Sequence, residues 1–367
     1  MSPIINWMGG WPKEGLVSGA DWEERLTVAA KEAVESAVNR APERLRLQAE
    51  QRLRAQLAAG LLKHKTGGDE QLLMLTSGAD AGLAWLLEKL LTPGDVILTE
   101  HLTSRAALHA FRKADMQVKA VQGDEEGMHP DALSAAIHRE RPRMVYISAA
   151  CTDPEGRSWS PERKKKAAQA CRESGVLLVT DDRQEMLLYD NDGCLEKPEP
   201  GSLSIGQLPP GLIAGFRFGW IAGSSIDIMP AAGKANFPVE HLALSRLLDT
   251  QPLEPLIEML RVQCAERLRQ MTEQLRRCGQ PDLMWTSPKG GLHLWLHLPS
   301  GLDGESLLRA AWLKGLIFQP GAPFYAANPH KNTLRLTHAF ADERQIKLGV
   351  TRLSESIEEF TGRWSRS

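Results

Sequence analysis

Short apolar runs separated by helix-like stretches recur along the first two thirds of the chain. The runs 116–123, 143–150 and 175–182 read as successive strands that are apolar on both faces. A strand of this kind fits a parallel sheet that helices cover on both sides, because neither face meets water. The pattern predicts an α/β fold in which a mainly parallel sheet lies between helices.

The pattern changes from about residue 240. A long helical segment (241–279) precedes 290–299, 316–321 and 333–340, which alternate in the manner of strands in a sheet with one solvated face. We therefore expect a smaller C-terminal α+β domain. The predicted divisions are an N-terminal arm with the first helices at 1–45, a large domain at 46–240, and a small domain at 241–367 that begins with the interdomain helix.

Bulk properties exclude several classes of partner. The 44 Lys and Arg residues nearly balance the 46 Asp and Glu residues, and no long run of one sign suggests binding to nucleic acid. Five widely spaced cysteines include no Cys-x-x-Cys pair, so we expect no metal site and a reducing compartment. No signal peptide or membrane span is evident, which predicts a cytoplasmic protein.

Three features of the sequence suggest a ligand-binding site. Gly78 and Ala79 lie between an apolar run and a helix, where backbone N–H groups point outward. Asp181 ends an apolar strand, at the sheet edge where open α/β sheets bind ligands. Arg335 lies in an otherwise apolar strand, where a guanidinium needs an anionic partner.

The order and spacing of many segments resemble fold type I pyridoxal phosphate (PLP) aminotransferases of class I/II, and most closely the aminotransferase-like domain of MocR-type regulators. The resemblance covers nearly the whole chain. It is carried by INWMGGWP (5–12), LTSGADAGL (75–83), LTPGDVIL (91–98), GMHPDAL (127–133), RPRMVYISAACTDPEG (141–156), GVLLVTDD (175–182), GFRFGW (215–220), GGLHLWLHLP (290–299), FQPGAPFY (318–325) and LRLTHAF (334–340).

This resemblance implies a homodimer with PLP between the domains. Asp181 matches the aspartate that pairs with the pyridine nitrogen, Arg217 the phosphate-binding arginine, and Arg335 the arginine that binds the substrate carboxylate. The alternatives are a cap or turn role for Asp181 and structural ion pairs for the two arginines.

The position of the Schiff-base lysine departs from the family. Aligned on GFRFGW, that position is Pro210, and no lysine lies between Lys197 and Lys234. Proline has no side-chain amine, so it can form neither the internal aldimine nor the proton shuttle. Two phosphate-binding hydroxyl positions are Gln207 and Pro209, and their donors are lost as well.

Other contacts of the family change in the same direction. The ring-stacking aromatic is replaced by a serine and the asparagine near the ring oxygen by an aspartate, while two tyrosine positions carry amides. The phosphate-binding turn carries an aspartate that either repels a phosphate or points away as a helix-start residue. These positions are, in that order, Ser104, Asp153, Gln184, Asn39 and Asp80.

We therefore expect a degenerate, non-catalytic member of the family that keeps a pocket for an anionic or amino-acid-like ligand. One alternative is an active PLP-dependent aminotransferase with a lysine from elsewhere, for which Lys234 is the candidate. Another is a regulatory subunit that acts through a partner, because MocR proteins carry a DNA-binding domain ahead of this one, whereas the resemblance here begins within the first ten residues.

Overall fold

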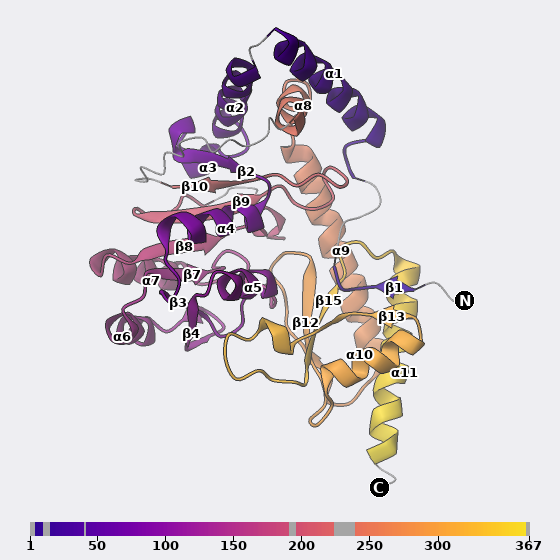
Figure 1. Ribbon diagram of the computed structural model, residues 1–367. Helices are drawn as coiled ribbons and strands as arrows, with labels where there is room; N and C mark the ends of the chain where they lie inside the picture. Colours follow the sequence, from indigo (N-terminus) through magenta and orange to yellow (C-terminus); the bar gives the residue numbers. More distant parts are fainter. Residues whose placement is uncertain (1–3, 10–14, 40–41, 191–195, 224–238, 365–367) are drawn as a thin grey trace.

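A seven-stranded sheet is the largest sheet of the computed structural model, which describes residues 4–9, 15–39, 42–190, 196–223 and 239–364 (Figure 1). The strands follow the order β2-β10-β9-β8-β7-β3-β4. Strand β10 runs antiparallel to both neighbours, and the other pairs are parallel, so the expected mainly parallel sheet is confirmed. The bounds are β2 (Leu73–Thr76), β3 (Val96–Glu100), β4 (Gln117–Val121), β7 (Met144–Ile147), β8 (Leu177–Asp181), β9 (Ser202–Gln207) and β10 (Gly219–Ala222).

Helices cover both faces of this sheet, which explains why its central strands lack polar alternation. On β8, Val179 packs in the cluster that contains α4 and α5, whereas Leu178 packs with α6 and α7. Edge strand β4 differs from the expectation: its first four residues are exposed or half-buried, because it has a neighbour on one side only. The helices are α4 (Ala79–Leu90), α5 (Arg105–Lys113), α6 (Pro130–Glu140) and α7 (Pro161–Glu173).

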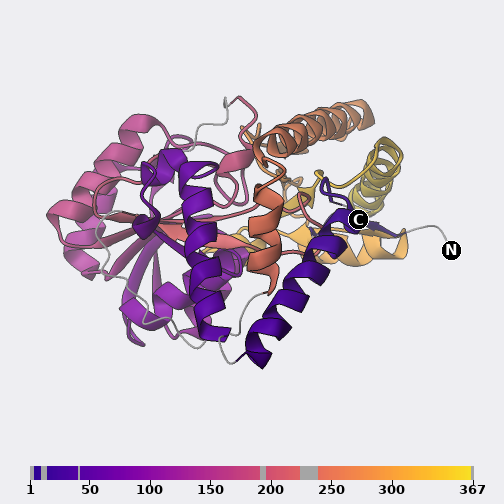
Figure 2. The same cartoon turned by 90° about the horizontal axis from the view of Figure 1, so that it is seen from above.

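Two N-terminal helices pack with a later pair at one end of the molecule (Figures 1 and 2). They are α1 (Gly19–Val38) and α2 (Pro42–Ala59), and α3 (Lys63–Thr66) follows them. The expected helical segment after residue 240 consists of two helices, α8 (Val239–Leu248) and α9 (Glu254–Cys278). Pro252 lies in the break between them, and proline lacks the N–H that a continuous helix needs.

A second, antiparallel sheet follows α9 in the order β11-β12-β15-β14. Its strands are β11 (Met284–Trp285), β12 (His293–His297), β14 (Gln319–Pro320) and β15 (Thr333–Thr337), and its helices are α10 (Gly304–Leu313) and α11 (Glu343–Trp364). Near the N-terminus, β1 (Ile5–Asn6) pairs with β13 (Leu316–Ile317). The remaining short elements are β5 (Gly123–Asp124), β6 (Gly127–Met128), η1 (Glu70–Leu72), η2 (Glu185–Leu187) and η3 (Ala322–Phe324).

The small sheet does not have the solvated face that the alternation predicted. Leucines of β12 and β15 pack in one cluster with residues of α9 and α11. The opposite face carries Trp295 and Arg335, and all five residues of β15 are buried. Trp295 packs against Phe324 of η3 and Arg335 reaches Asp153 near the large sheet, so polar alternation here marks a face turned toward the rest of the protein.

None of the helices in the described part of the chain is long and apolar enough to cross a lipid bilayer.

Candidate ligand-binding site

A cleft of about 980 Å³ brings most of the sequence-predicted site residues together. Its wall combines the starts of α4 and α5, the segments after β7, β8 and β9, and the small-sheet strands β14 and β15. The predicted residues that line it are Gly78, Ala79, Asp80, Ser104, Asp153, Gln184, Gln207, Pro210, Arg217 and Arg335. Asp181 lies behind the wall, since its side chain is 1% exposed, and Asn39 lies at the exposed end of α1, away from the cleft.

At the start of α4, the side-chain amide of a residue on β9 contacts the expected anion site. Gly78 has a φ of 100°, a left-handed conformation that glycine adopts without strain, and it places the following N–H groups at the cleft. The Ala79 N–H donates to Oε1 of Gln207, the last residue of β9, at 3.3 Å. This donor, which the resemblance assigns to a phosphate, therefore already has an acceptor.

Arg183 is the main site residue that the sequence analysis missed. Its Nε donates to both oxygens of Asp181, at 2.8 and 2.9 Å, and its Nη2 lies 2.7 Å from Oδ2. Its Nη1 reaches Oδ1 of Asp80 at 2.7 Å. The Tyr146 hydroxyl donates a hydrogen bond to Oδ2 of Asp181. Asp181 is therefore at the predicted place at the end of β8, but its partner is an arginine of the same chain.

Arg183 keeps its charge and Tyr146 its proton at neutral pH. Burial disfavours the charged guanidinium of Arg183, but Asp181 and Asp80 outweigh it and hold the pKa of Arg183 above its usual range. Burial, with the negative charge of Asp181, raises the pKa of Tyr146, so the phenol keeps its proton and remains a donor. Asp80 turns toward Arg183 with its side chain 60% exposed, rather than pointing away from the site.

Arg335 also has an internal partner. Its Nη1 lies 2.7 Å from Oδ1 of Asp153, and its guanidinium lies 4.6 Å from the centre of the Phe324 ring. Burial, together with the nearby Arg105 and Arg183, lowers the pKa of Arg335, while Asp153 opposes that shift. The Nε atom is buried without a hydrogen-bond partner among the described residues. A buried donor in this state is a place for a ligand oxygen.

The remaining predicted positions are Gln184, Ser104, Pro210 and Arg217. Gln184 accepts the Leu292 N–H at 3.1 Å and so ties the segment after β8 to the entry of β12. Ser104 is the residue before α5, and its side chain makes no capping hydrogen bond. Pro210 lines the cleft and supplies no amine. Arg217 is exposed on the cleft wall.

A row of basic side chains on α5 is the second feature that the sequence analysis missed. Arg105, His109 and Arg112 all line the cleft and are exposed. Their spacing of four and three residues places them on one helical face, a signal that was visible in the sequence. They give the cleft wall a cationic side opposite the small sheet.

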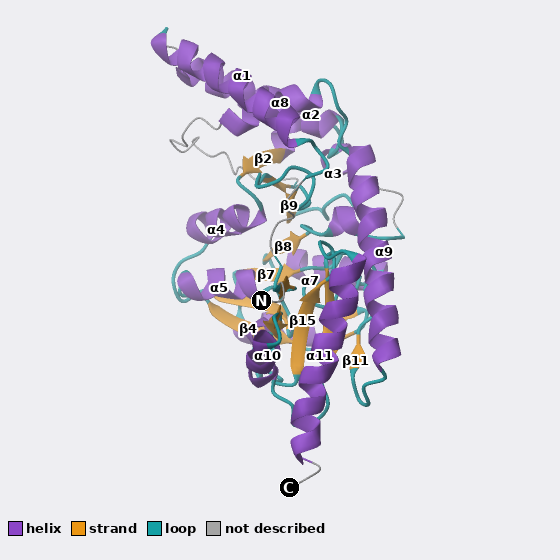
Figure 3. Ribbon diagram, turned by 90° about the vertical axis from the view of Figure 1, so that its right-hand side faces the viewer, coloured by secondary structure: helices purple, strands orange, loops and turns teal. Residues whose placement is uncertain are grey.

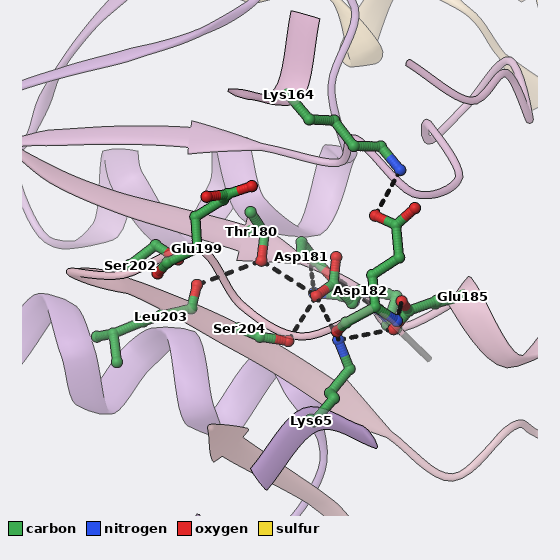
Figure 4. A network of polar contacts seen from close by, with 12 residues as sticks. Lys65, Lys164, Thr180, Asp181, Asp182, Glu185, Glu199, Ser202, Leu203 and Ser204 are labelled. Carbon is green, nitrogen blue, oxygen red and sulfur yellow. Dashed lines mark hydrogen bonds and ion pairs between the residues drawn. The ribbon is translucent and has the colours of Figure 1, made fainter. Parts of the chain in front are cut away.

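A buried lysine near the cleft is unsuited to Schiff-base chemistry. Lys65 on α3 is 2% exposed in its side chain and lies 2.9 Å from Oδ2 of Asp182 and 2.7 Å from Oε2 of Glu185 (Figure 4). Burial favours the neutral amine, but the two carboxylates outweigh it and raise the pKa of Lys65. A protonated, fully engaged amine is not a nucleophile. Lys234 lies outside the described residues.

These residues do not fit PLP held as a covalent cofactor. The cleft-lining residues within the described ranges include no lysine. The Asp181 carboxylate, which the resemblance assigns to the ring nitrogen, contacts Arg183, and the N–H at the start of α4 contacts Gln207. Three positions that the resemblance assigns to the cofactor are therefore replaced or occupied by side chains of this chain.

The chain is similar to known aminotransferases. Residues 18–192 match the family model described as aminotransferase class I and II. The 2-aminoadipate transaminase of Thermus thermophilus is 28% identical over 298 residues, which cover 78% of this chain and 75% of that protein. An uncharacterised HTH-type transcriptional regulator of Escherichia coli is 25% identical over 303 residues, which cover 78% of this chain and 64% of the regulator.

The crystal structure of kynurenine aminotransferase from Pyrococcus horikoshii agrees with this fold. It superposes with a TM-score of 0.80 at 28% identity and covers 98% of this chain and 92% of that one. Among these relatives the regulator is more distant than the transaminase, contrary to the expectation that MocR-type regulators are the nearest group. This chain is similar to class I and II aminotransferases and has the fold type I architecture.

Proposed function

We propose that the chain is a degenerate aminotransferase that forms no Schiff base and uses its cleft to bind an anionic or amino-acid-like molecule. The observation that carries this proposal is Pro210, which lines the cleft where the resemblance puts the catalytic lysine. Without an amine at that place, the chain lacks both the covalent attachment and the proton carrier of transamination. Arg217 and Arg335 then belong to a residual pocket rather than to a catalytic centre, and Asp181 lies behind its wall.

The charges of the cleft favour an anionic ligand. Its described wall carries Arg105, Arg112, Arg183, Arg217 and Arg335 against the carboxylates of Asp80, Asp153 and Glu305. A concave site with an excess of one charge attracts ligands of the other sign. A carboxylate that enters between the two domains meets the unpaired Nε of Arg335 on one side and α5 on the other.

The first test is chemical trapping. Purified protein is mixed with PLP, its absorption spectrum is recorded, and borohydride reduction is followed by peptide mapping. We expect the spectrum to show no absorption band of an internal aldimine formed in a one-to-one ratio. We also expect peptide mapping to find no single lysine that is modified preferentially. A single trapped lysine contradicts the proposal and identifies a catalytic residue.

The competing function is PLP-dependent transamination. The similarity to the 2-aminoadipate transaminase of Thermus thermophilus favours it. It requires a lysine from elsewhere, with Lys234 as the candidate. In the trapping experiment this function predicts an aldimine that disappears in Lys234→Ala. The same spectrum therefore separates the two functions.

The second test is calorimetric titration with propionate, glutarate and inorganic phosphate. We expect at least one of these anions to bind with one site per chain, and Arg335→Gln to weaken that binding. If none of them binds, the cleft is not a pocket for a simple anion. Thermal unfolding of each variant confirms that it is folded before it is titrated.

We also propose that the chain forms a homodimer in the cytoplasm. Any regulation by this dimer then goes through a protein partner rather than through direct contact with nucleic acid. Apolar side chains exposed on α1 and α2 support the dimer: Val34 is 63%, Val38 76% and Leu47 50% exposed. Large exposed apolar residues that lie close together often mark an interface. Sedimentation equilibrium tests the assembly, and a monomer at all concentrations contradicts it.

A further inference from the structure

Absence of a lysine does not by itself keep PLP out of a cleft, because a phosphorylated pyridine can also bind without a covalent bond. Whether it does depends on the groups that hold the ring and the phosphate. In this chain, the group expected to hold the ring and the group expected to hold the phosphate already contact other side chains. At the ring position, that side chain is Arg183.

The carboxylate of Asp181 has almost no capacity for a further donor. Its Oδ1 accepts from the Arg183 backbone N–H at 3.2 Å and from Nε at 2.8 Å. Its Oδ2 accepts from Tyr146, contacts Nε at 2.9 Å and lies 2.7 Å from Nη2. A carboxylate offers about four acceptor positions in total. A pyridinium N–H can bind here only after the guanidinium has moved.

Moving Arg183 breaks two ion pairs at once. Its side chain is 14% exposed, and it bridges Asp181 behind the cleft to Asp80 at the start of α4. Separation of a buried pair leaves an uncompensated charge, which is strongly unfavourable. A single pyridinium donor replaces one hydrogen bond of this arrangement, whereas the guanidinium supplies a planar set of donors to both carboxylates.

The phosphate end is opposed as well. Gln207 accepts the Ala79 N–H, and the Asp80 carboxylate lies one residue further along the first turn of α4. A phosphate at this helix start displaces an amide oxygen and approaches a like charge. The ring and phosphate positions are therefore closed by separate side chains.

From these contacts we propose that Arg183 is a specificity-determining residue, whose guanidinium takes the place of a pyridinium on Asp181 and excludes phosphorylated pyridines, so that the cleft admits only anions without such a ring. This inference rests on the proposed function and goes further, because it covers non-covalent binding. It also assigns the exclusion of the ring to Arg183, whereas Gln207 and Asp80 oppose the phosphate.

Pyridoxine 5′-phosphate is a suitable probe, since its alcohol group cannot react with lysines and its ring is fluorescent. Equilibrium dialysis with fluorescence detection compares wild type, Arg183→Ala and the control Arg157→Ala. Arg157 forms a comparable ion-pair cluster with Glu125 and Glu155 outside the cleft. We expect Arg183→Ala to bind the probe at least about tenfold more tightly than wild type, and Arg157→Ala to behave as wild type.

Several results overturn the inference. Tight binding of the probe by wild type overturns it without any variant. Equal affinities of wild type and Arg183→Ala for the probe show that Arg183 does not exclude the ring. A gain in Arg157→Ala as large as in Arg183→Ala shows a general effect of lost charge. If circular dichroism shows that Arg183→Ala is unfolded, Arg183→Gln takes its place, with the same expected direction.

Failure of this inference is distinguishable from failure of the proposed function. The probe forms no aldimine, so its binding does not report on a catalytic lysine. Conversely, a lysine trapped with PLP refutes the degenerate function whatever the affinity for the probe. Titration of wild type with propionate, glutarate and phosphate shows separately whether the cleft accepts anions without a ring.

Discussion

The Nη1 atom of Arg335 lies 2.7 Å from Oδ1 of Asp153, and this contact joins β15 of the small sheet to the segment that follows β7 of the large sheet. The arginine that matches the family's carboxylate-binding position is thus engaged by a carboxylate of its own chain. A ligand acid must share the guanidinium with Asp153, and the negative charge of Asp153 opposes it.

Asp153→Asn is therefore expected to strengthen anion binding. The amide keeps a hydrogen-bond acceptor for Arg335 and removes the competing charge, which we expect to raise the affinity for glutarate about threefold to tenfold. Calorimetric titration measures the change. Glu125→Gln, a similar loss of charge outside the cleft, is the control, and weaker binding by Asp153→Asn contradicts the predicted competition.

Arg105→Gln is expected to weaken anion binding by a similar factor, about threefold to tenfold, because one cation leaves the wall opposite Arg335. Lys113→Gln is a matched control: it removes the same charge from the same helix, but Lys113 does not line the cleft. Titrations with glutarate at low and high salt measure both variants. Equal losses in the two variants indicate a general effect of net charge.

Lys65→Met is expected to lower the free energy of unfolding by about 3–5 kcal/mol, because Asp182 and Glu185 are then buried together without their cation. Urea denaturation measures the loss, and Glu185→Gln in the same background restores part of it by removing one carboxylate. Lys164→Met is the control (Figure 4): its partner Glu196 is 62% exposed, so the expected cost is about 1 kcal/mol or less. Similar costs for both lysines contradict the special role of Lys65.

His338 predicts a loss of stability in acid. Burial, with some repulsion from Arg267, lowers its pKa from 6.5 to about 3. The unfolded chain therefore binds this proton at a higher pH than the folded chain does, and stability falls as the pH drops from about 6.5 toward 3. Between about pH 7 and pH 5, wild type is expected to lose about 2 kcal/mol more than His338→Gln in urea denaturation. His138→Gln, at an exposed position, is the control, and a wild-type pH dependence in His338→Gln contradicts the prediction.

The fold could be predicted from the sequence because positions that are buried in the fold carry apolar residues. Residues such as Leu178 and Val179 are both apolar because each faces a helical layer. At β15 the same pattern led to the wrong prediction of a solvated face. Alternation shows which residues face away from the core but not what covers them. There the polar side meets the cleft rather than water.

The contacts of the candidate site were less predictable. Asp181 could be placed at the end of a strand, but the partner of its carboxylate depends on the path of the next two residues, which no periodicity specifies. Arg183 curls back onto Asp181 through the turn before η2. Gln207 was predicted as the loss of a hydroxyl donor, whereas its amide oxygen acts as an acceptor at the start of α4.

The bridge that Arg183 forms between Asp181 and Asp80 also bears on nutrition and expression. In an enzyme whose buried aspartate is neutralised by a vitamin-derived ring, the stable folded population depends on the supply of that vitamin, because a bound ligand stabilises the native state. Here the neutralising cation is encoded in the chain and arrives with its synthesis. On the proposed function, cells starved of vitamin B6 are expected to hold the same amount of this protein, folded to the same extent, as cells that are fully supplied.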